Sequence, residues 1–249
     1  MIWRRLIVGL VLCAVAATAV VAARADYLVA DLSKRRIDIT LGFAGAEVLL
    51  FGATDGKGDV IVVVRGPNQP VIVREKQRVA GIWINWDWTE FSQAPSFYYV
   101  ASSRPLDEIA SESVLAGIGA GLDNVRTVAV SASTDAERAA FRDALIGANR
   151  ADGLYGAGPG EVTFLAERLF RTTVSFPDNV APGPYNVEIY LVRDGIVEKG
   201  ERRTLFITKV GLSAAVYERA QENAVLYGLL AVLIALMAGG LGAIGLRKV

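Results

Sequence analysis

Short apolar runs of strand length dominate the first hundred positions of the chain. They alternate with polar residues or are rich in β-branched side chains, and they lie at 37–40, 47–51, 60–64, 71–73, 81–84 and 97–101. Glycines at 56 and 58 separate two of them as a hairpin turn would. Strands that recur about every ten residues with glycine and proline between them are typical of a β-sandwich. We therefore predict a first Ig-like β-sandwich unit over residues 26–104.

The apolar period changes between residues 105 and 160. Pro105 suits the first turn of a helix, and two acidic residues follow it at 107 and 108. Thr134 and Glu137 have the spacing of a capping box, and an apolar stripe at helical spacing follows over 140–148. The segment 105–160 is therefore predicted to be a helical insert that ends in a glycine-rich linker.

Strand patterns return after residue 160. Residues 185–191 alternate between apolar and polar side chains, and Asp194-Gly195 is a hairpin signal. These features predict a second Ig-like β-sandwich unit over 161–210. A short amphipathic helix is expected over 211–223, near the membrane interface.

The first 25 residues have the pattern of a secretory signal peptide. Arg4 and Arg5 precede an unbroken apolar run, and Ala23-Arg24-Ala25 forms a cleavage site. We expect the mature chain to begin at Asp26. An uncleaved anchor helix is the alternative.

Residues 224–246 form a second apolar run, 23 residues long and without charge. At about 1.5 Å per residue this run is long enough, as a helix, to cross a hydrocarbon core of about 30 Å. Arg247 and Lys248 follow at once, which favours a cytoplasmic C-terminus for the tail 247–249. The sequence thus predicts a single-pass protein of the inner membrane whose body lies in the periplasm.

Small residues recur along this expected transmembrane helix. They form helical stripes made of Ala235, Ala238, Gly239, Gly242 and Ala243. Such stripes allow a second membrane helix to approach closely. The alternative is the ordinary glycine and alanine content of a membrane helix.

Charge and composition exclude several function classes. The chain has no histidine and one cysteine, Cys13, so histidine-based catalysis, zinc sites of the usual kind and an internal disulfide are excluded. Without Arg4, Arg5, Arg24, Arg247 and Lys248, the body has 21 basic and 26 acidic residues, a net charge of −5. This balance argues against nucleic-acid binding, and we expect neither a metal nor an organic cofactor.

Several short fragments carry a resemblance to a known family. They are 82–85 (Ile-Trp-Ile-Asn), 95–98 (Pro-Ser-Phe-Tyr), 101–106, 183–187 (Gly-Pro-Tyr-Asn-Val) and 209–212. Together they make the chain resemble the alphaproteobacterial putative transmembrane protein family. The resemblance implies a signal, an external β-rich region and one C-terminal helix, and it supplies no catalytic residues. It also implies a partner of the sulfite-exporter-type permease class.

Aromatic residues cluster between positions 83 and 99. Trp86, Trp88 and Phe91 are candidates for a partner surface, because tryptophan is a common interface anchor. Packing within the sandwich is the alternative for them, and it is the favoured interpretation for Trp83 and Ile84. On a regular strand, Trp83 and Trp88 would lie on opposite faces.

Carboxylates offer weaker candidates for chemistry. Asp55 and Asp59 flank a turn but lack the ligand ladder of a calcium loop, so a hairpin turn is the preferred interpretation. The pairs Asp87 with Glu90 and Asp107 with Glu108 would need an enclosed site to act as acid and base. The leading hypothesis is a non-catalytic accessory protein of a membrane complex that contacts an integral membrane protein or a second copy of itself. A small-ligand sensing module and a cofactor-free enzyme are the alternatives.

Overall fold

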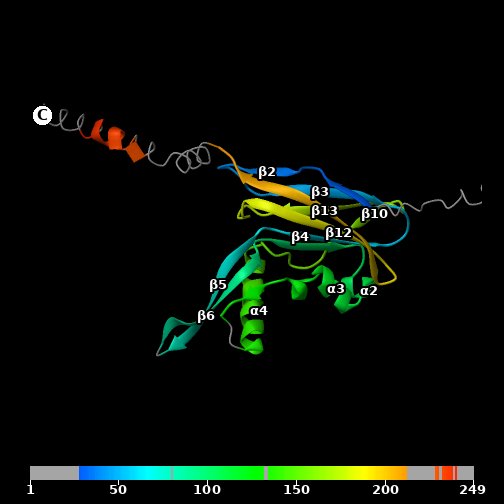
Figure 1. Cartoon of the computed structure of the whole chain (residues 1–249), viewed down its shortest axis with the longest axis horizontal. Coiled ribbons are helices and arrows are strands. Elements are labelled where there is room, and N and C mark those ends of the chain that lie inside the picture. The colour runs from blue at the N-terminus through cyan, green and yellow to red at the C-terminus, as the bar shows by residue number, and fades with distance from the viewer. Residues whose placement is uncertain are drawn as a thin grey trace, which may run out of the picture.

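The computed structural model describes residues 28–79, 81–131, 134–211, 228–229, 232–237 and 239. Over these residues the protein is mainly β, as predicted, and its strands form three sheets (Figure 1). However, the strands are combined into sheets in a different way from the one predicted.

Two sheets are built from strands that lie far apart in the sequence. The first has the order β1 (Leu28–Leu32), β3 (Ala46–Thr54), β11 (Leu169–Phe176) and β10 (Thr163–Leu165), all antiparallel. The second has the order β2 (Arg36–Ile39), β13 (Ile196–Lys209), β12 (Gly183–Arg193), β4 (Asp59–Arg65), β7 (Tyr98–Ser102) and β9 (Gly160–Glu161). Its edge strands β2 and β9 pair in parallel with their neighbours.

These two sheets pack face to face around one apolar core. Strand β11 alternates strictly between exposed and buried residues, so Phe170 and Val174 point into the core. Strands β4 and β12 supply Val62 and Ile189 from the opposite sheet. In β11 the alternation therefore shows which side of the strand is buried.

The two predicted Ig-like units do not form separate sandwiches. Strand β3, from the first unit, pairs along its length with β11, from the second. Strands β4 and β12 are joined in the same way in the other sheet. This exchange places β3 between β1 and β11 in the first sheet and β4 between β12 and β7 in the second. The result is one sandwich that contains strands from both predicted units.

The segment predicted to be helical covers the outer face of the second sheet. It contains α2 (Leu106–Ile109), α3 (Glu112–Ile118), the 3₁₀ turn η1 (Leu122–Asn124) and α4 (Asp135–Ala151). The capping box is present at α4, where Thr134 Oγ1 accepts from Glu137 N at 3.2 Å. Ile61 and Val63 of β4 pack against Leu115 of α3 in a second core. Because helices cover one face and the first sheet covers the other, β4 is buried on both.

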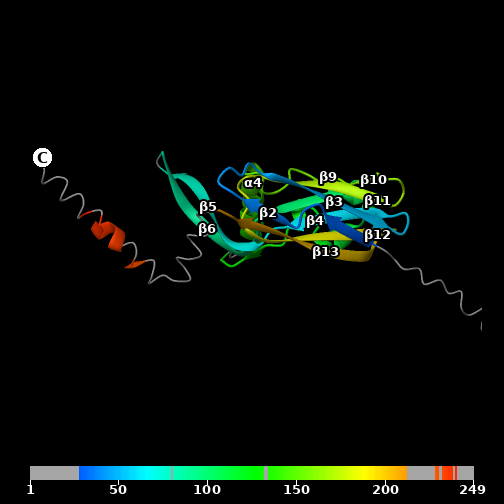
Figure 2. The ribbon, with the colours of Figure 1, turned by 90° about the horizontal axis from the view of Figure 1, so that it is seen from above.

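A long hairpin leaves the sandwich and forms the third sheet. Its strands are β5 (Asn68–Val79) and β6 (Ile82–Pro95), with the short β8 (Val128–Ala129) at the edge. We call residues 68–95 the arm. At about 3.3 Å per residue, twelve residues of β5 span roughly 40 Å. The base of the arm packs on α4 through Phe91, Phe141 and Leu145, and the rest projects from the body (Figures 1 and 2).

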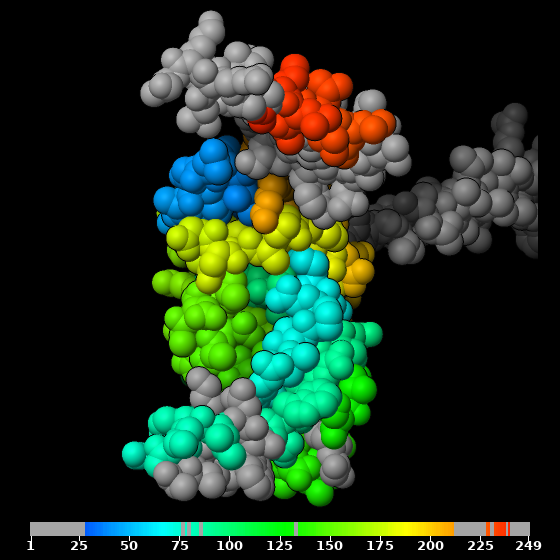
Figure 3. All heavy atoms as spheres, turned by 90° about the vertical axis from the view of Figure 1, so that its left-hand side faces the viewer, coloured from blue at the N-terminus to red at the C-terminus, as the bar shows by residue number. Residues whose placement is uncertain are grey.

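The arm and the C-terminal part of the chain leave the sandwich at the same end. Strand β2 runs parallel to β13, with Ile39 opposite Lys209, so both strands finish there. The approach to β5 lies there too, since a Cβ on Gly183, the partner of Ile207, would come within 2.9 Å of Pro67 Cγ. We call this the exit end. Figure 3 looks onto it, with the arm at the bottom and the last residues of β13, in orange, near the top.

The expected signal segment 1–25 and the tail 247–249 lie outside the described residues. So does most of the expected juxtamembrane helix 211–223 and of the expected transmembrane helix 224–246. Ala235 and Gly239 are described and helical, whereas Ala238, Gly242 and Ala243 lie outside the described residues. Within the part of the chain that is described, no helix is both long and apolar enough to cross a membrane.

Candidate functional site

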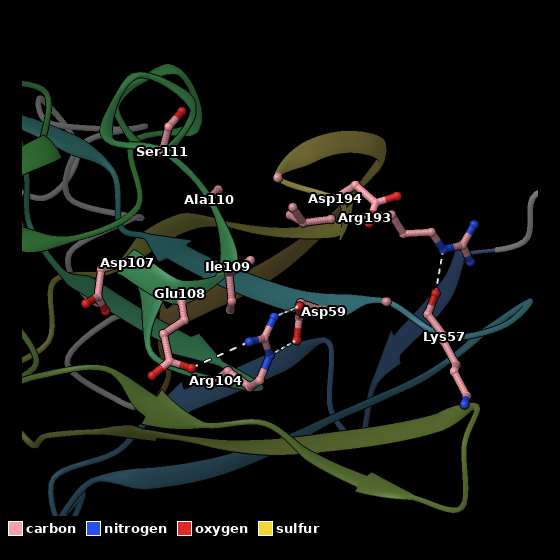
Figure 4. A pocket seen from close by; sticks show the side chains of 13 residues that line it. Lys57, Asp59, Arg104, Asp107, Glu108, Ile109, Ala110, Ser111, Arg193 and Asp194 are labelled. Atoms are coloured by element: carbon pink, nitrogen blue, oxygen red, sulfur yellow. Dashed lines mark hydrogen bonds and ion pairs between the residues drawn. The ribbon is translucent and has the colours of Figure 1, made fainter.

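Two regions of the body have features of a functional site, and they lie at opposite ends of the sandwich. One is the exposed aromatic surface of the arm, at the exit end. The other is a hollow of about 650 Å³ at the far end, beside the β12–β13 turn and α2 (Figure 4). The side chains of each region decide what it can do.

An ion-pair network occupies the wall of the hollow. Arg104 donates to both oxygens of Asp59, from Nη2 to Oδ2 at 2.6 Å and from Nε to Oδ1 at 3.0 Å (Figure 4). Ser103 Oγ also donates to Asp59 Oδ1, at 2.8 Å. The hydrogen bonds from Arg104 hold the pKa of Asp59 below its usual range, despite the opposing effect of burial. A general base works best with a pKa near the operating pH, so this carboxylate is poorly suited to proton transfer.

A second arginine, Arg193, binds the turn at 55–59, which was weighed above as a calcium-binding loop. Arg193 Nε donates to the carbonyl oxygen of Lys57 at 2.6 Å, and its Nη2 pairs with Asp55. The bond to Arg193 lowers the pKa of Asp55. Asp55 and Asp59 are therefore held by two different guanidinium groups. The turn between them connects β3 of the first sheet to β4 of the second, so the interpretation as a hairpin turn is wrong.

The arm displays its apolar residues on a surface that bends around a bulge. Arg74 lies opposite Trp88 and Arg78 opposite Trp83, while the register shifts between Glu75 and Lys76. The shift leaves Trp86 as the extra residue of a β-bulge. Since Arg74 and Arg78 are four residues apart on β5, both tryptophans lie on the same face of the hairpin. Regular alternation had placed them on opposite faces, and the bulge is the reason for the difference.

This face of the arm is open to solvent. On this face Ile72 and Trp88 each keep 52% of their surface exposed, and Trp83 keeps 66%. Ile82 at the tip keeps 68%, but it lies opposite Val79 and therefore on the other face. Near the body, Ile72 lies opposite Glu90 and Arg74 opposite Trp88. We call these four residues the stem face. Trp83 lies further out, on the tip.

The structure corrects part of the predicted aromatic surface. Trp88 is exposed, which fits a contact role, but Phe91 is fully buried beneath α4 and cannot contact a partner. Phe91 and Thr89 alternate with Trp88, so they point to the other side of the hairpin. The side chain of Trp86 lies outside the described residues. The interpretation of Trp83 as a core residue is wrong, while Ile84 is half-buried.

Ile72, Ile82 and Trp83 were not predicted as surface residues, because 71–73 and 81–84 were interpreted as two short strands of a sandwich. The available signal was the continuous strand-like pattern on both sides of Gly81, which has φ +88 in the turn. The two strands of this hairpin have 12 and 14 residues, whereas a typical strand has about five or six. The hairpin therefore projects beyond the sandwich.

The comparisons with known proteins give a family without an assigned activity. A family described as "Putative transmembrane protein (Alph_Pro_TM)" matches residues 27–248. The chain therefore belongs to this family. No curated protein matches it.

Proposed function

We propose that this member of the putative transmembrane protein family is a non-catalytic accessory protein of a membrane complex. It is anchored in the inner membrane by residues 224–246, its signal segment 1–25 is removed, and its body lies in the periplasm. The family description supports association with a membrane. The uncharged run of 23 residues followed by Arg247 and Lys248 supports the anchor and its orientation.

The exposed arm is the observation that carries this proposal. Ile72 and Trp88 lie diagonally across the hairpin on the stem face, each half exposed, with Glu90 and Arg74 as their respective cross-strand partners. Tryptophan and arginine are enriched among residues that dominate protein interfaces, and contiguous apolar patches are uncommon on surfaces that stay in water. The stem face therefore has the composition of a protein contact site.

The partner proposed for the stem face is an integral membrane protein, with a sulfite-exporter-type permease as the specific candidate. A second copy of the chain is the other. The small residues Ala235, Ala238, Gly239, Gly242 and Ala243 would add a contact within the bilayer. The contact through the stem face and the contact within the bilayer could form with the same partner, because the arm and the C-terminal segment both leave the sandwich at the exit end.

The rival functions receive less support from the described geometry. A sensing module would need a cavity lined by the aromatic cluster. The hollow instead has Asp59, Arg104 and Arg193 in its lining, which includes no aromatic residue among those described. An enzyme would need an acid and a base there. Asp107, Glu108 and Asp194 also line the hollow. However, Asp59 and Glu108 are both paired with Arg104, which lowers the pKa of Asp59.

Loss of partner capture by a stem-face variant tests the proposal. The full chain with Ile72→Ser and Trp88→Ser should capture its partner from detergent-solubilised membranes at least about thirtyfold less well, since a hot-spot side chain contributes about 2 kcal/mol or more. Phe51→Ser is the matched control, because Phe51 is 46% exposed on the first sheet, away from the arm. Equal capture by the stem-face variant and the wild type would contradict the proposal.

A further inference from the structure

The tip of the arm differs in charge from the rest of it. Residues 76–86 contain Lys76 and Arg78 and no acidic residue, whereas the carboxylates of the arm, Glu75, Asp87 and Glu90, lie closer to the body. The body as a whole is acidic, so this tip is a local positive region on a negative protein. A positive tip is attracted to a surface of opposite charge.

The same tip is apolar and open. Ile82 and Trp83 keep about two thirds of their surface exposed, and Trp83 lies opposite Arg78. Arg78 Nε donates to the carbonyl oxygen of Gly81 at 3.4 Å, which holds the guanidinium group close to the turn. Tryptophan and tyrosine concentrate at the membrane–water interface, where the ring meets acyl chains and the N–H meets headgroups. Basic residues close to an anionic lipid surface strengthen such contacts.

The position of the arm brings this tip toward the side on which the chain enters the membrane. Strand β13 finishes at Lys209 on the exit end, and about a dozen residues separate Gly211 from the expected anchor at 224. Even fully extended, such a segment reaches only about 45 Å. The arm starts at the same end and is itself about 40 Å long. Figures 1 and 2 show the arm pointing outward on the side where β13 ends.

A further exposed apolar residue, outside the arm, lies at the exit end. Leu41 follows β2 by two residues and is 100% exposed. Val210 N donates to Ile39 O at 2.9 Å, so the turn that carries Leu41 sits beside the start of the C-terminal segment. Two separate loops thus present apolar side chains at the end of the body that the anchor holds nearest to the bilayer.

From these observations we propose that the tip of the arm docks into the headgroup region of an anionic phospholipid membrane, with Trp83 as the inserted side chain. The inference rests on the proposed function, because the C-terminal anchor supplies the nearby bilayer. It extends that function by dividing the arm into two parts. The stem face binds protein, and the tip binds lipid and fixes the angle at which the stem face is presented.

The tryptophan content of the chain allows a direct test. All four tryptophans are Trp3, in the signal segment, and Trp83, Trp86 and Trp88, in the arm. The full chain with Trp3→Phe, Trp86→Phe and Trp88→Phe retains Trp83 alone. The matched control with Trp3→Phe, Trp83→Phe and Trp86→Phe retains Trp88 alone. Both are reconstituted into phosphatidylcholine vesicles with or without phosphatidylglycerol, and emission is followed with brominated lipid and with aqueous acrylamide as quenchers.

We expect Trp83 emission to shift to the blue, to be quenched by brominated lipid and to lose most of its acrylamide quenching. The shift should be larger with phosphatidylglycerol and should fall when Lys76→Ala and Arg78→Ala are added. Trp88 should stay open to acrylamide. If Trp83 remains accessible to acrylamide and is not quenched by brominated lipid, the inference is wrong. If Trp83→Ala then also reduces partner capture, the tip contacts the protein partner and not the lipid.

Flotation of the vesicles separates this inference from the proposed function. A chain that does not float with the lipid contradicts the anchor, and with it the proposed function. A chain that floats while Trp83 shows no lipid quenching contradicts the docking of the tip alone.

Discussion

Replacing Glu188 with alanine should lower the free energy of unfolding by about 3 kcal/mol or more. Glu188 lies on β12, is only 8% exposed and forms an ion pair with Arg65 of β4. Arg202 Nη2 donates to its other oxygen at 2.6 Å, and Tyr190 Oη donates at 3.1 Å. Removing the carboxylate leaves the Arg65 guanidinium, itself 20% exposed, without its counter-charge. Breaking one side of a buried pair is costly for this reason.

Arg65 also ties the helical layer to the second sheet. Its Nη2 donates to the carbonyl oxygens of Ile118 and Gly119 at the end of α3. Tyr98 Oη donates to the same Gly119 oxygen at 2.9 Å, and burial raises the pKa of Tyr98 to about 12, so the hydroxyl stays a donor. Loss of Glu188 should therefore loosen α3 as well as the sheet.

The effect of Glu188→Ala should depend on pH. Burial tends to raise the pKa of Glu188, but Arg65, Arg202 and Tyr190 more than offset this and lower it. A lowered pKa in the folded state gives stability that is present above the unfolded value, about 4.3, and is lost as the pH falls through the folded pKa. The gap between wild type and variant should be complete at neutral pH and shrink below about pH 4.

Urea unfolding of the full chain in detergent, followed by circular dichroism, measures this gap. The matched control is Glu198→Ala, because Glu198 pairs with Arg193 at 2.6 Å but is 42% exposed. An exposed pair contributes about 1 kcal/mol or less. Equal losses for the two variants would contradict the account of Glu188 as the junction between sheet and helices.

The second large effect is expected at Gly52, in the middle of β3. This residue lies opposite Ala30 on one side and Phe170 on the other. A Cβ at this position would overlap the ring of Phe170 and the carbonyl oxygen of Val29. Because Phe170 is buried in the sandwich core, the ring cannot swing into solvent. Gly52→Val should therefore cost about 3 kcal/mol through overpacking.

Gly147→Val provides the control for this substitution. Gly147 lies on α4, and a Cβ there meets nothing within 4 Å. Valine also has a higher helix propensity than glycine, so no loss of stability is expected. Thermal unfolding of the two variants should separate them clearly. A melting temperature for Gly52→Val equal to that of the wild type would show that the core can accommodate the extra atoms.

Local signals in the sequence predicted local structure well. The capping box of Thr134 and Glu137 marks the start of α4, and the alternation of 185–191 lies within β12. These patterns depend on hydrogen bonds and side-chain periods within a few residues. They identify an element without reference to the rest of the chain. The alternation does not give the buried side of β12, because Glu188, one of its polar positions, is buried as well.

The arrangement of the strands could not be predicted in the same way. The pairing of β3 with β11 joins residues more than a hundred positions apart, and several partners would satisfy the same alternation. The nearest strands in the sequence were therefore grouped into two units. The structure shares them between two sheets instead.

The candidate site was predicted in part for a related reason. The composition of the arm pointed to Trp88 as a candidate surface residue, and Trp88 is exposed. Its neighbours depend on a bulge that has no sequence signature here. Phe91 and Trp88 are equally aromatic, and α4, which packs on one side of the hairpin, decides that Phe91 is buried. Exposure of Trp83 follows from the length of the arm beyond that helix.

The central claim is that the body is held in the periplasm by the C-terminal segment, and both proposals depend on it. Cysteine labelling in intact cells with a thiol reagent that does not cross the inner membrane tests this most directly. Cys13 lies in the expected signal segment, and Gly158 is exposed with open space around it. The account predicts that Gly158→Cys is labelled in intact spheroplasts, whereas Lys248→Cys is labelled only after lysis. Protection of Gly158→Cys until lysis, or labelling of Lys248→Cys before it, would contradict the account.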